Sequence, residues 1–150
     1  MSPVVGDPAP DFALPDENGE PVELSDFRGV RVLLVFYPGD DTPVCTRQLC
    51  DYRDGLEQFQ DLGVRVVGIS RDDAVSHRRF KARHGLPFTL LSDPDLAVAK
   101  AYGAAGPLGM KRAVFLIDEA GTIRYAHIES LALFRRRRAE LLEELQRLAE

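Results

Sequence analysis

Two cysteines, Cys45 and Cys50, lie five residues apart in the segment TPVCTRQLC. A cysteine does chemistry as the thiolate, which is a nucleophile and is readily oxidised. The alternative is that both thiols only fill a core, since free cysteine is among the most buried residue types. Where the fold places the pair decides between the two interpretations.

The segment before the cysteines predicts a junction between a strand and a helix. Residues 31–37 (RVLLVFY) form an apolar run typical of a strand buried on both faces, and a helix should follow to about Leu62. Thr42 is a good N-cap and Pro43 suits the first helical position, so Cys45 would lie in the first turn. There, unpaired backbone N–H groups and the helix dipole favour the thiolate. We also expect the Thr42 hydroxyl to accept from a helix N–H and to donate to a substrate oxygen.

The spacing of the two thiols constrains what they can do together. Five residues along an intact α-helix separate two Cα atoms by roughly 8–9 Å. A disulfide needs about 4.4–6.8 Å, so Cys45 and Cys50 could bond only if the helix unwinds. Such a pair suits a cycle in which one thiolate is oxidised and the other traps it. Two packing cysteines in an amphipathic helix remain the alternative.

The elements that position this segment can be predicted along the rest of the chain. Helices are expected between a cap at Asp72 or Asp73 and His84, from Asp93-Pro94 through Ala101 or Tyr102, and from about Leu133 to the end of the chain. A further strand is expected at 64–70, a short apolar piece follows around 89–91, and residues 113–117 and 123–128 are expected to form a hairpin. Crossover helices imply parallel pairing, whereas the late hairpin adds antiparallel strands. The prediction is a single α/β domain over residues 1–150, with a mixed sheet flanked by helices and an N-terminal hairpin around Asn18-Gly19.

Composition and charge exclude several function classes. A chain of 150 residues suits one domain, and its net charge of −5 argues against a general nucleic-acid binder. No apolar run approaches the roughly 20 residues of a membrane span, and the first residues lack the features of a signal peptide. A cytoplasmic location is therefore expected. His77, His84 and His127 lack ligand-like spacing, so a metal site is not expected.

The segment YPGDDTPVCTRQLC resembles the active-site segment of peroxiredoxins, which are thiol peroxidases with a thioredoxin-like fold. Pro38, Thr42 and Cys45 match the pattern Pro-x-x-x-Thr-x-x-Cys, and Cys50 is similar to the second cysteine of the Q, or bacterioferritin-comigratory, subtype. The resemblance extends over about residues 4 to 128. KRAVFLIDEAGTIRY is similar to the family's late hairpin, which implies that Arg112 lies near the reactive sulfur.

The resemblance implies reduction of hydrogen peroxide and organic hydroperoxides without a metal or organic cofactor. Cys45 would attack, Thr42 and backbone N–H groups would hold the peroxide, and Arg112 would stabilise the thiolate and the transition state. Pro38 would shield the pocket. Cys50 would close a disulfide that a thioredoxin- or glutaredoxin-like reductant reopens. The chain is expected to act as a monomer or weak dimer.

Two other function classes stay open. A general thiol-disulfide oxidoreductase of the thioredoxin type would carry Cys-x-x-Cys, whereas four residues separate the cysteines here. A non-enzymatic redox sensor would use the same disulfide switch.

Two departures from the family pattern, Val44 for glycine and Gln48 for glutamate, affect the rim of the pocket and the charge of the helix.

The remaining polar groups are expected to have structural or solvated roles. Asp40 and Asp41 should be solvated in their loop, because a thiolate at a helix N-terminus needs no base. His77 and His84 are expected to be exposed or half-buried on one helix. The basic run 135–138 precedes several glutamates, so pairing on a solvated helix explains it.

Overall fold

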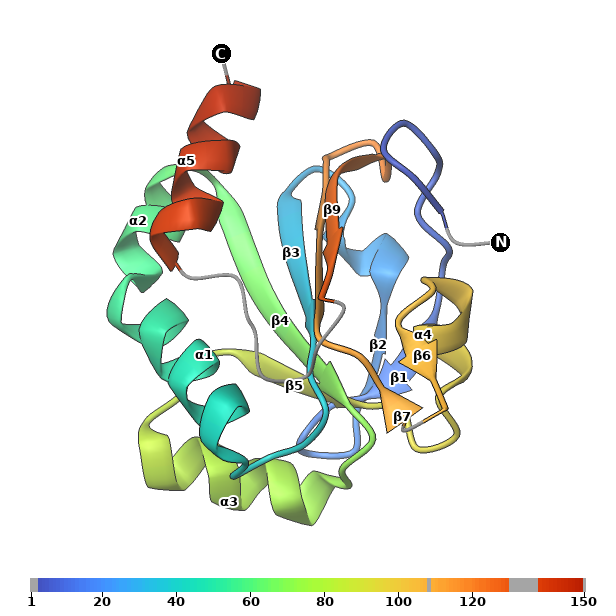
Figure 1. Ribbon diagram of the computed structural model, residues 1–150, viewed down its shortest axis with the longest axis vertical. Helices are drawn as coiled ribbons and strands as arrows, with labels where there is room; N and C mark the ends of the chain where they lie inside the picture. Colours follow the sequence, from blue (N-terminus) through green and yellow to red (C-terminus); the bar gives the residue numbers. More distant parts are fainter. Residues whose placement is uncertain (1–2, 108, 130–137, 150) are drawn as a thin grey trace.

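A five-stranded mixed sheet forms the centre of the protein. The computed structural model describes residues 3–107, 109–129 and 138–149. The strands lie in the order β5-β4-β3-β8-β9, with β3, β4 and β5 parallel and β8 and β9 antiparallel to their neighbours (Figure 1). Their bounds are β3 (Arg31–Phe36), β4 (Val64–Ser70), β5 (Thr89–Ser92), β8 (Ala113–Ile117) and β9 (Ile123–Ile128). The predicted mixed sheet and its late hairpin are confirmed.

The central strand β3 is buried on both faces, as its apolar sequence predicts. Leu33 and Val35 belong to one core, whereas Leu34 and Phe36 belong to the core on the opposite face. This alternation follows from the period of two in a strand. Both cores hold β3 in place, so the loop after its last residue starts from a fixed point.

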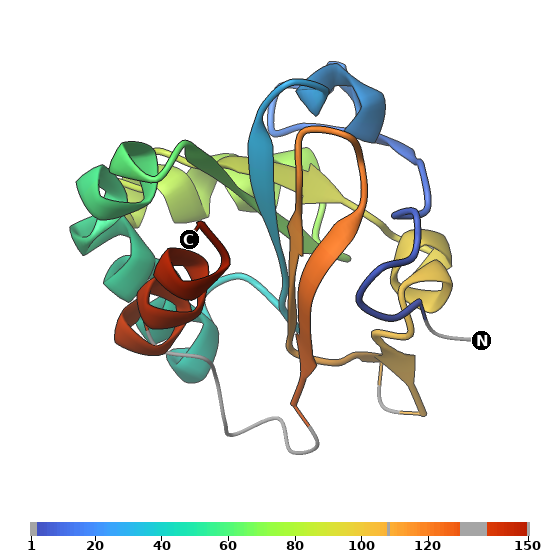
Figure 2. The ribbon, with the colours of Figure 1, turned by 90° about the horizontal axis from the view of Figure 1, so that it is seen from above.

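Helices cover both faces of the sheet (Figure 2). One face carries α1 (Pro43–Asp54), α2 (Leu56–Asp61), α3 (Ala74–His84) and α5 (Arg138–Ala149). The other carries α4 (Ala97–Ala101), the N-terminal hairpin of β1 (Ala13–Pro15) and β2 (Pro21–Glu23), the 3-10 helix η1 (Leu24–Phe27), and the small hairpin of β6 (Ala105–Gly106) and β7 (Gly109–Met110). The predicted flanking helices and N-terminal hairpin are thus confirmed.

The helix after Thr42 does not run unbroken to Leu62, so that prediction is wrong. It ends at Asp54, and Gly55 separates it from α2. The break lets Tyr52 of α1 and Phe59 of α2 pack edge to face, with ring centroids 5.8 Å apart. Burial of both aromatic rings therefore favours two short helices over one long one.

The helix α4 begins later than predicted. The helix was expected to begin at Asp93-Pro94, but its first residue is Ala97. The preceding residue, Leu96, has a left-handed φ of 61°. Asp93 nevertheless supplies the cap, because its carboxylate accepts from the N–H groups of Val98 and Ala99 at 3.2 and 2.9 Å. The sequence therefore indicated the capping residue correctly, but it did not indicate how many residues separate this cap from the helix.

The other helix predictions are confirmed within the described residues. Asp73 caps α3 by accepting from the N–H of Ser76, and Gly85 ends the helix with a left-handed φ of 60°. Leu141 and Leu145 of α5 are buried. The predicted start of that helix near Leu133 and residues 135–137 of the basic run lie outside the described residues. No helix in the described ranges is long and apolar enough to cross a membrane.

Candidate active site

Cys45 lies in the first turn of α1, in the predicted register. Thr42 is the N-cap with extended dihedrals, and Pro43 is the first helical residue. The first intrahelical hydrogen bond runs from the N–H of Thr46 to the carbonyl of Thr42 at 2.8 Å. The N–H groups of Val44 and Cys45 precede this bond, so they point out of the helix end. They create a partial positive charge beside the sulfur.

Arg112 is the cation that the fold brings to the sulfur. Its Nη1 donates to the Cys45 Sγ at 2.8 Å, and only 4% of Arg112 and none of Cys45 is exposed. Arg112 immediately precedes β8, whose Ala113 pairs with Phe36 at the end of β3. Two segments that are distant in sequence therefore meet where the end of β3 lies beside the start of β8. A guanidinium in contact with a buried sulfur favours the thiolate over the neutral thiol.

Thr42 uses its hydroxyl differently from the expectation. The hydroxyl donates to the carbonyl of Gly39 at 2.9 Å and makes no side-chain hydrogen bond to the helix. The expected side-chain cap is therefore wrong, although Thr42 is the N-cap by its backbone. The hydroxyl instead closes the loop between β3 and α1. Pro38 begins that loop and is half-buried.

Cys50 lies in the same continuous helix as Cys45 and is half-buried. Both thiols are free. Because α1 is intact through both positions, their Cα atoms are roughly 8–9 Å apart, too far for a disulfide. The structure therefore corresponds to the reduced arrangement of the pair.

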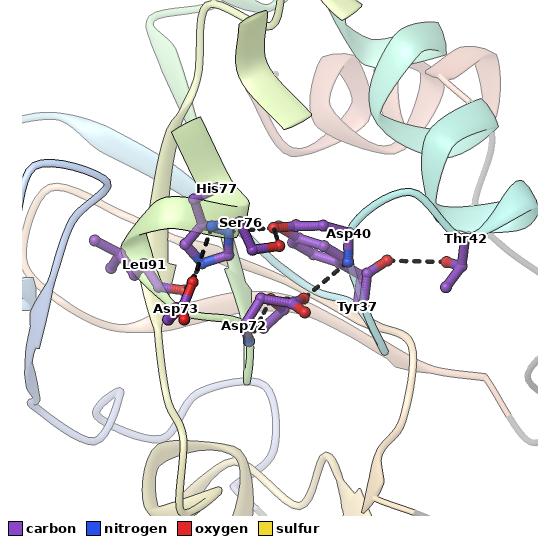
Figure 3. A network of polar contacts seen from close by, with 10 residues as sticks. Tyr37, Asp40, Thr42, Asp72, Asp73, Ser76, His77 and Leu91 are labelled. Carbon is purple, nitrogen blue, oxygen red and sulfur yellow. Dashed lines mark hydrogen bonds and ion pairs between the residues drawn. The ribbon is translucent and has the colours of Figure 1, made fainter. Parts of the chain in front are cut away.

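Two residues of a buried polar network were assigned the wrong environment from the sequence. The side chain of Asp40 is 2% exposed and that of His77 is fully buried, and they contact each other at 2.7 Å (Figure 3). The expectations of a solvated Asp40 and an exposed or half-buried His77 are therefore wrong. One signal was available, because His77 lies three residues before the buried Phe80 and so shares its helix face.

Tyr37 completes the network from the end of β3. Its hydroxyl donates to Asp40 Oδ1 at 2.6 Å. Burial, followed by the charge of Asp40, raises the pKa of Tyr37 well above its ordinary value. The phenol therefore keeps its proton and remains a donor.

Gln48, one of the two departures from the family pattern, is 1% exposed on the inner face of α1. Its Nε2 donates to the Tyr52 hydroxyl at 3.1 Å, while its Oε1 has no hydrogen-bond partner among the described residues. A neutral amide thus stands in the core one turn after Cys45. Across the described ranges, no group of three or more His, Cys, Asp and Glu side chains gathers as metal ligands do.

Comparison with known proteins agrees with this geometry. The model of the AhpC/TSA family matches residues 5–126. A Coxiella burnetii protein named as a peroxiredoxin bcp is 46% identical over 131 residues, which cover 82% of this chain and 87% of that protein. The rice protein named peroxiredoxin Q, chloroplastic (Oryza sativa subsp. japonica), is 44% identical over 125 residues, 81% of this chain and 58% of the longer rice protein.

A solved structure shows the same fold. The bacterioferritin comigratory protein of Xanthomonas campestris, described for its alkyl peroxide reduction activity, superposes with a TM-score of 0.84 at 28% identity. The match covers 93% of this chain and 92% of that chain. The predicted thioredoxin-like fold is therefore confirmed. The chain belongs to the AhpC/TSA family and, within it, to the peroxiredoxins of the bcp/Q kind, which are thiol peroxidases.

Proposed function

We propose that Cys45 is the peroxidatic nucleophile and that its substrates are hydrogen peroxide and organic hydroperoxides. One observation carries the assignment: the Arg112 Nη1 lies 2.8 Å from a Cys45 sulfur in the first turn of a helix. A buried thiol between a guanidinium and a helix N-terminus is set up to react as a thiolate. The alkyl peroxide activity described for the Xanthomonas campestris relative supports organic hydroperoxides as substrates.

The first step is a displacement at the O–O bond. The Cys45 thiolate attacks one peroxide oxygen, a S–O bond forms, and the O–O bond breaks. The other oxygen leaves with the bonding electrons and takes a proton, so the products are a sulfenic acid and water or an alcohol. Arg112 and the N–H groups at the start of α1 stabilise the charge that develops on the leaving oxygen. Thr42, after rotation of its hydroxyl away from Gly39, holds the peroxide, and Pro38 shields the pocket.

The second step requires Cys50. Once the first turns of α1 unwind, the Cys50 thiol attacks the sulfenic sulfur of Cys45, and a disulfide and water form. A thioredoxin- or glutaredoxin-like dithiol then reduces the disulfide by exchange and is itself oxidised. Each turnover thus reduces one peroxide and oxidises one dithiol.

The setting of the activity is also part of the proposal. One domain over residues 1–150 carries both cysteines, and the chain acts as a monomer or weak dimer. A disulfide that must be reduced in every cycle needs a compartment with a supply of dithiol reductant, which favours the cytoplasm. The name of the rice relative assigns that protein to the chloroplast.

A coupled assay tests the proposed function. Oxidation of NADPH through thioredoxin reductase and thioredoxin should depend on peroxide and on this protein, and Cys45→Ser should abolish it while the fold is kept. A general thiol-disulfide oxidoreductase would instead reduce a disulfide substrate without peroxide. A redox sensor would be oxidised once and would not turn over. Retention of most activity in Cys45→Ser would refute the assignment.

A further inference from the structure

Asp40 fastens the loop between β3 and α1 to α3 by contacts of its buried side chain. Its Oδ2 accepts from the Ser76 hydroxyl at 2.8 Å and contacts His77 Nδ1 at 2.7 Å, both on α3, while its Oδ1 accepts from Tyr37 (Figure 3). Its backbone N–H donates to Asp72 Oδ2 at 2.8 Å. Side chain and backbone of Asp40 together thus attach the active-site loop to the part of the fold that does not contain the cysteines.

The partners of His77 fix how many protons the Asp40–His77 pair holds. Its Nε2 lies 3.1 Å from the carbonyl oxygen of Leu91, which has no hydrogen to give, so Nε2 carries one. Its Nδ1 faces the Asp40 carboxylate, so that contact also needs a proton between the two atoms. The pair therefore holds one proton more than a neutral imidazole beside an ionised carboxylate would.

The charges around the pair agree with this assignment. Asp72 accepts from the Ser70 hydroxyl at 2.7 Å as well as from Asp40, so two carboxylates share the network. Tyr37 contributes a neutral phenol, and Asp73 is engaged at the end of α3 by the N–H of Ser76. A buried carboxylate is costly unless it is paired. His77 Nδ1 and the Ser76 hydroxyl are the groups of α3 that face Asp40.

A second pair of contacts lies at the exposed side of the same loop. Asp41 Oδ1 faces Arg83 Nη1 at 3.2 Å and His84 Nε2 at 3.4 Å. Asp41 also has a left-handed φ of 59°, an uncommon conformation for a residue other than glycine. Such a conformation persists only when the surroundings hold it. The buried contacts of Asp40 next to it are the strongest candidates to do so.

We propose that Asp40 and His77 are positioning residues, whose proton-bearing contact fixes the loop to α3 and thereby holds Thr42 at the start of α1 beside Cys45. The inference rests on the proposed function of Cys45. Thr42 follows Asp40 by two residues and is tied to the same loop by its bond to Gly39. Because α1 must unwind and reform in each cycle, it cannot itself hold the loop. The attachment to α3 preserves the site on which α1 reforms.

Two neutral amides at position 77 test the proposal. In His77→Asn the side-chain amide nitrogen takes the position of Nδ1, so this variant keeps a donor to Asp40. In His77→Gln the amide nitrogen takes the position of Nε2, so this variant loses that donor. His77→Gln should slow oxidation of Cys45 by hydrogen peroxide about tenfold or more, since a misplacement of about 1 Å can cost ~100-fold. His77→Asn should stay near the wild-type rate. His84→Gln, on the same helix but paired with Asp41, is the matched control and should leave the rate unchanged.

Nitrogen-15 spectra of labelled histidine read the protonation directly. In the reduced wild type at neutral pH both ring nitrogens of His77 should carry hydrogen. Asp40→Asn should remove one of them, because an amide can donate to the Nδ1 of a neutral ring. These spectra report the proton in the contact, whereas the rate of Cys45 oxidation reports the positioning role. Should His77→Gln fail to fold, Asp40→Asn and Asp40→Ala give the same comparison, with slow oxidation expected only for Asp40→Ala.

The outcomes separate this inference from the proposed function. A single ring N–H on wild-type His77 would overturn the proton-bearing pair, and a wild-type rate in His77→Gln would overturn the positioning role. If peroxide failed to oxidise Cys45 in the wild type, the proposed function itself would fall. Reduction of the oxidised protein by dithiothreitol should be equal in all variants, because the loop acts in the peroxide step.

Discussion

Nη1 of Arg112 lies 2.8 Å from Sγ of Cys45, although 67 residues separate them in the chain. The contact exists because β8 runs antiparallel to β3, so the start of one strand lies beside the end of the other. The charge at the sulfur therefore depends on the sheet as well as on the helix that carries the cysteine. Removal of this cation is the most direct test of the electrostatics of the site.

Arg112→Ala should slow the reaction of Cys45 with peroxide by about 10²-fold, by analogy with the loss of one oxyanion donor. Arg112→Lys keeps the charge but not the planar guanidinium, so its rate should lie between those of the wild type and Arg112→Ala. Arg124→Ala is the control, since Arg124 lies on β9 and pairs with Asp118 at 3.6 Å. The measurement is the second-order rate of Cys45 oxidation. A wild-type rate in Arg112→Ala would show that other groups stabilise the transition state.

The sequence predicted the parts of the fold that local pattern determines. The strands at 64–70, 113–117 and 123–128 are found with the same bounds, because their apolar runs and turn residues are local signals. The Thr42-Pro43 start of α1 also carries a local signal and was placed correctly. Arg112 came only from the resemblance to peroxiredoxins, since nothing near it in the chain indicates that it meets Cys45.

Tertiary contacts decided the features that the sequence did not reveal. The sequence alone suggests that Asp40 is a solvated loop residue, yet α3 supplies two polar partners that make its burial favourable. The Thr42 hydroxyl bonds to Gly39, since the loop curves back on itself. In the same way, the break at Gly55 follows from the packing of Tyr52 on Phe59. Each of these three features depends on where a contacting residue lies in the fold, and local sequence pattern does not predict that position.

Gly68 should be intolerant of a side chain. It lies in β4, and a Cβ there would stand 2.7 Å from Leu90 Cδ2 and 3.1 Å from Tyr37 Cε1. Gly68→Ala should therefore lower the free energy of unfolding by about 1–3 kcal/mol, a cost typical of overpacking. Gly106→Ala is the control, because the three atoms nearest its new Cβ belong to the flexible Lys111 side chain, which can move away. Equal urea midpoints for the two variants would contradict the expectation.

The buried tyrosines predict how stability changes at alkaline pH. Burial raises the pKa of Tyr102 above its ordinary value, and the charge of Asp11 adds a smaller increase. Burial also raises the pKa of Tyr37. In the unfolded chain these phenols ionise near pH 10. Their contribution to stability is therefore complete below about pH 10 and is lost as the pH rises above it, because only the unfolded state releases the protons. Each phenol should lower the free energy of unfolding by about 1.4 kcal/mol per pH unit in that range.

Tyr102→Phe isolates one of these contributions. The variant loses the hydrogen bond from Tyr102 to the Pro10 carbonyl, which should cost about 1 kcal/mol at neutral pH. Above about pH 10, its free energy of unfolding should fall less steeply than that of the wild type. Urea unfolding at several pH values measures both effects. Parallel curves for the two proteins would mean that Tyr102 ionises equally in both states.

The last prediction concerns α1, which cannot remain intact when its two cysteines join. Oxidation should unwind residues from about 42 to 50 and expose their amides, because an intact helix holds the two Cα atoms too far apart. Leu49 is buried in the same core as Cys45 and Leu141 of α5, so unwinding also removes apolar contacts. Protection in β3 and α3 should not change. The segment must therefore open at a free energy below that of global unfolding.

Hydrogen exchange on reduced and peroxide-treated protein measures this change, with α3 as the internal reference helix. Cys50→Ser is the matched variant: it cannot form the disulfide, so α1 should stay protected after peroxide treatment. Its Cys45 should then collect as sulfenic and, with excess peroxide, sulfinic acid, each visible as added oxygen in the intact mass. The first oxidation should be as fast as in the wild type, since Cys50 acts only afterwards. If α1 is equally protected in both redox states of the wild type and the Cys50 variant gains no oxygen, then Cys45 and Cys50 do not form this bond.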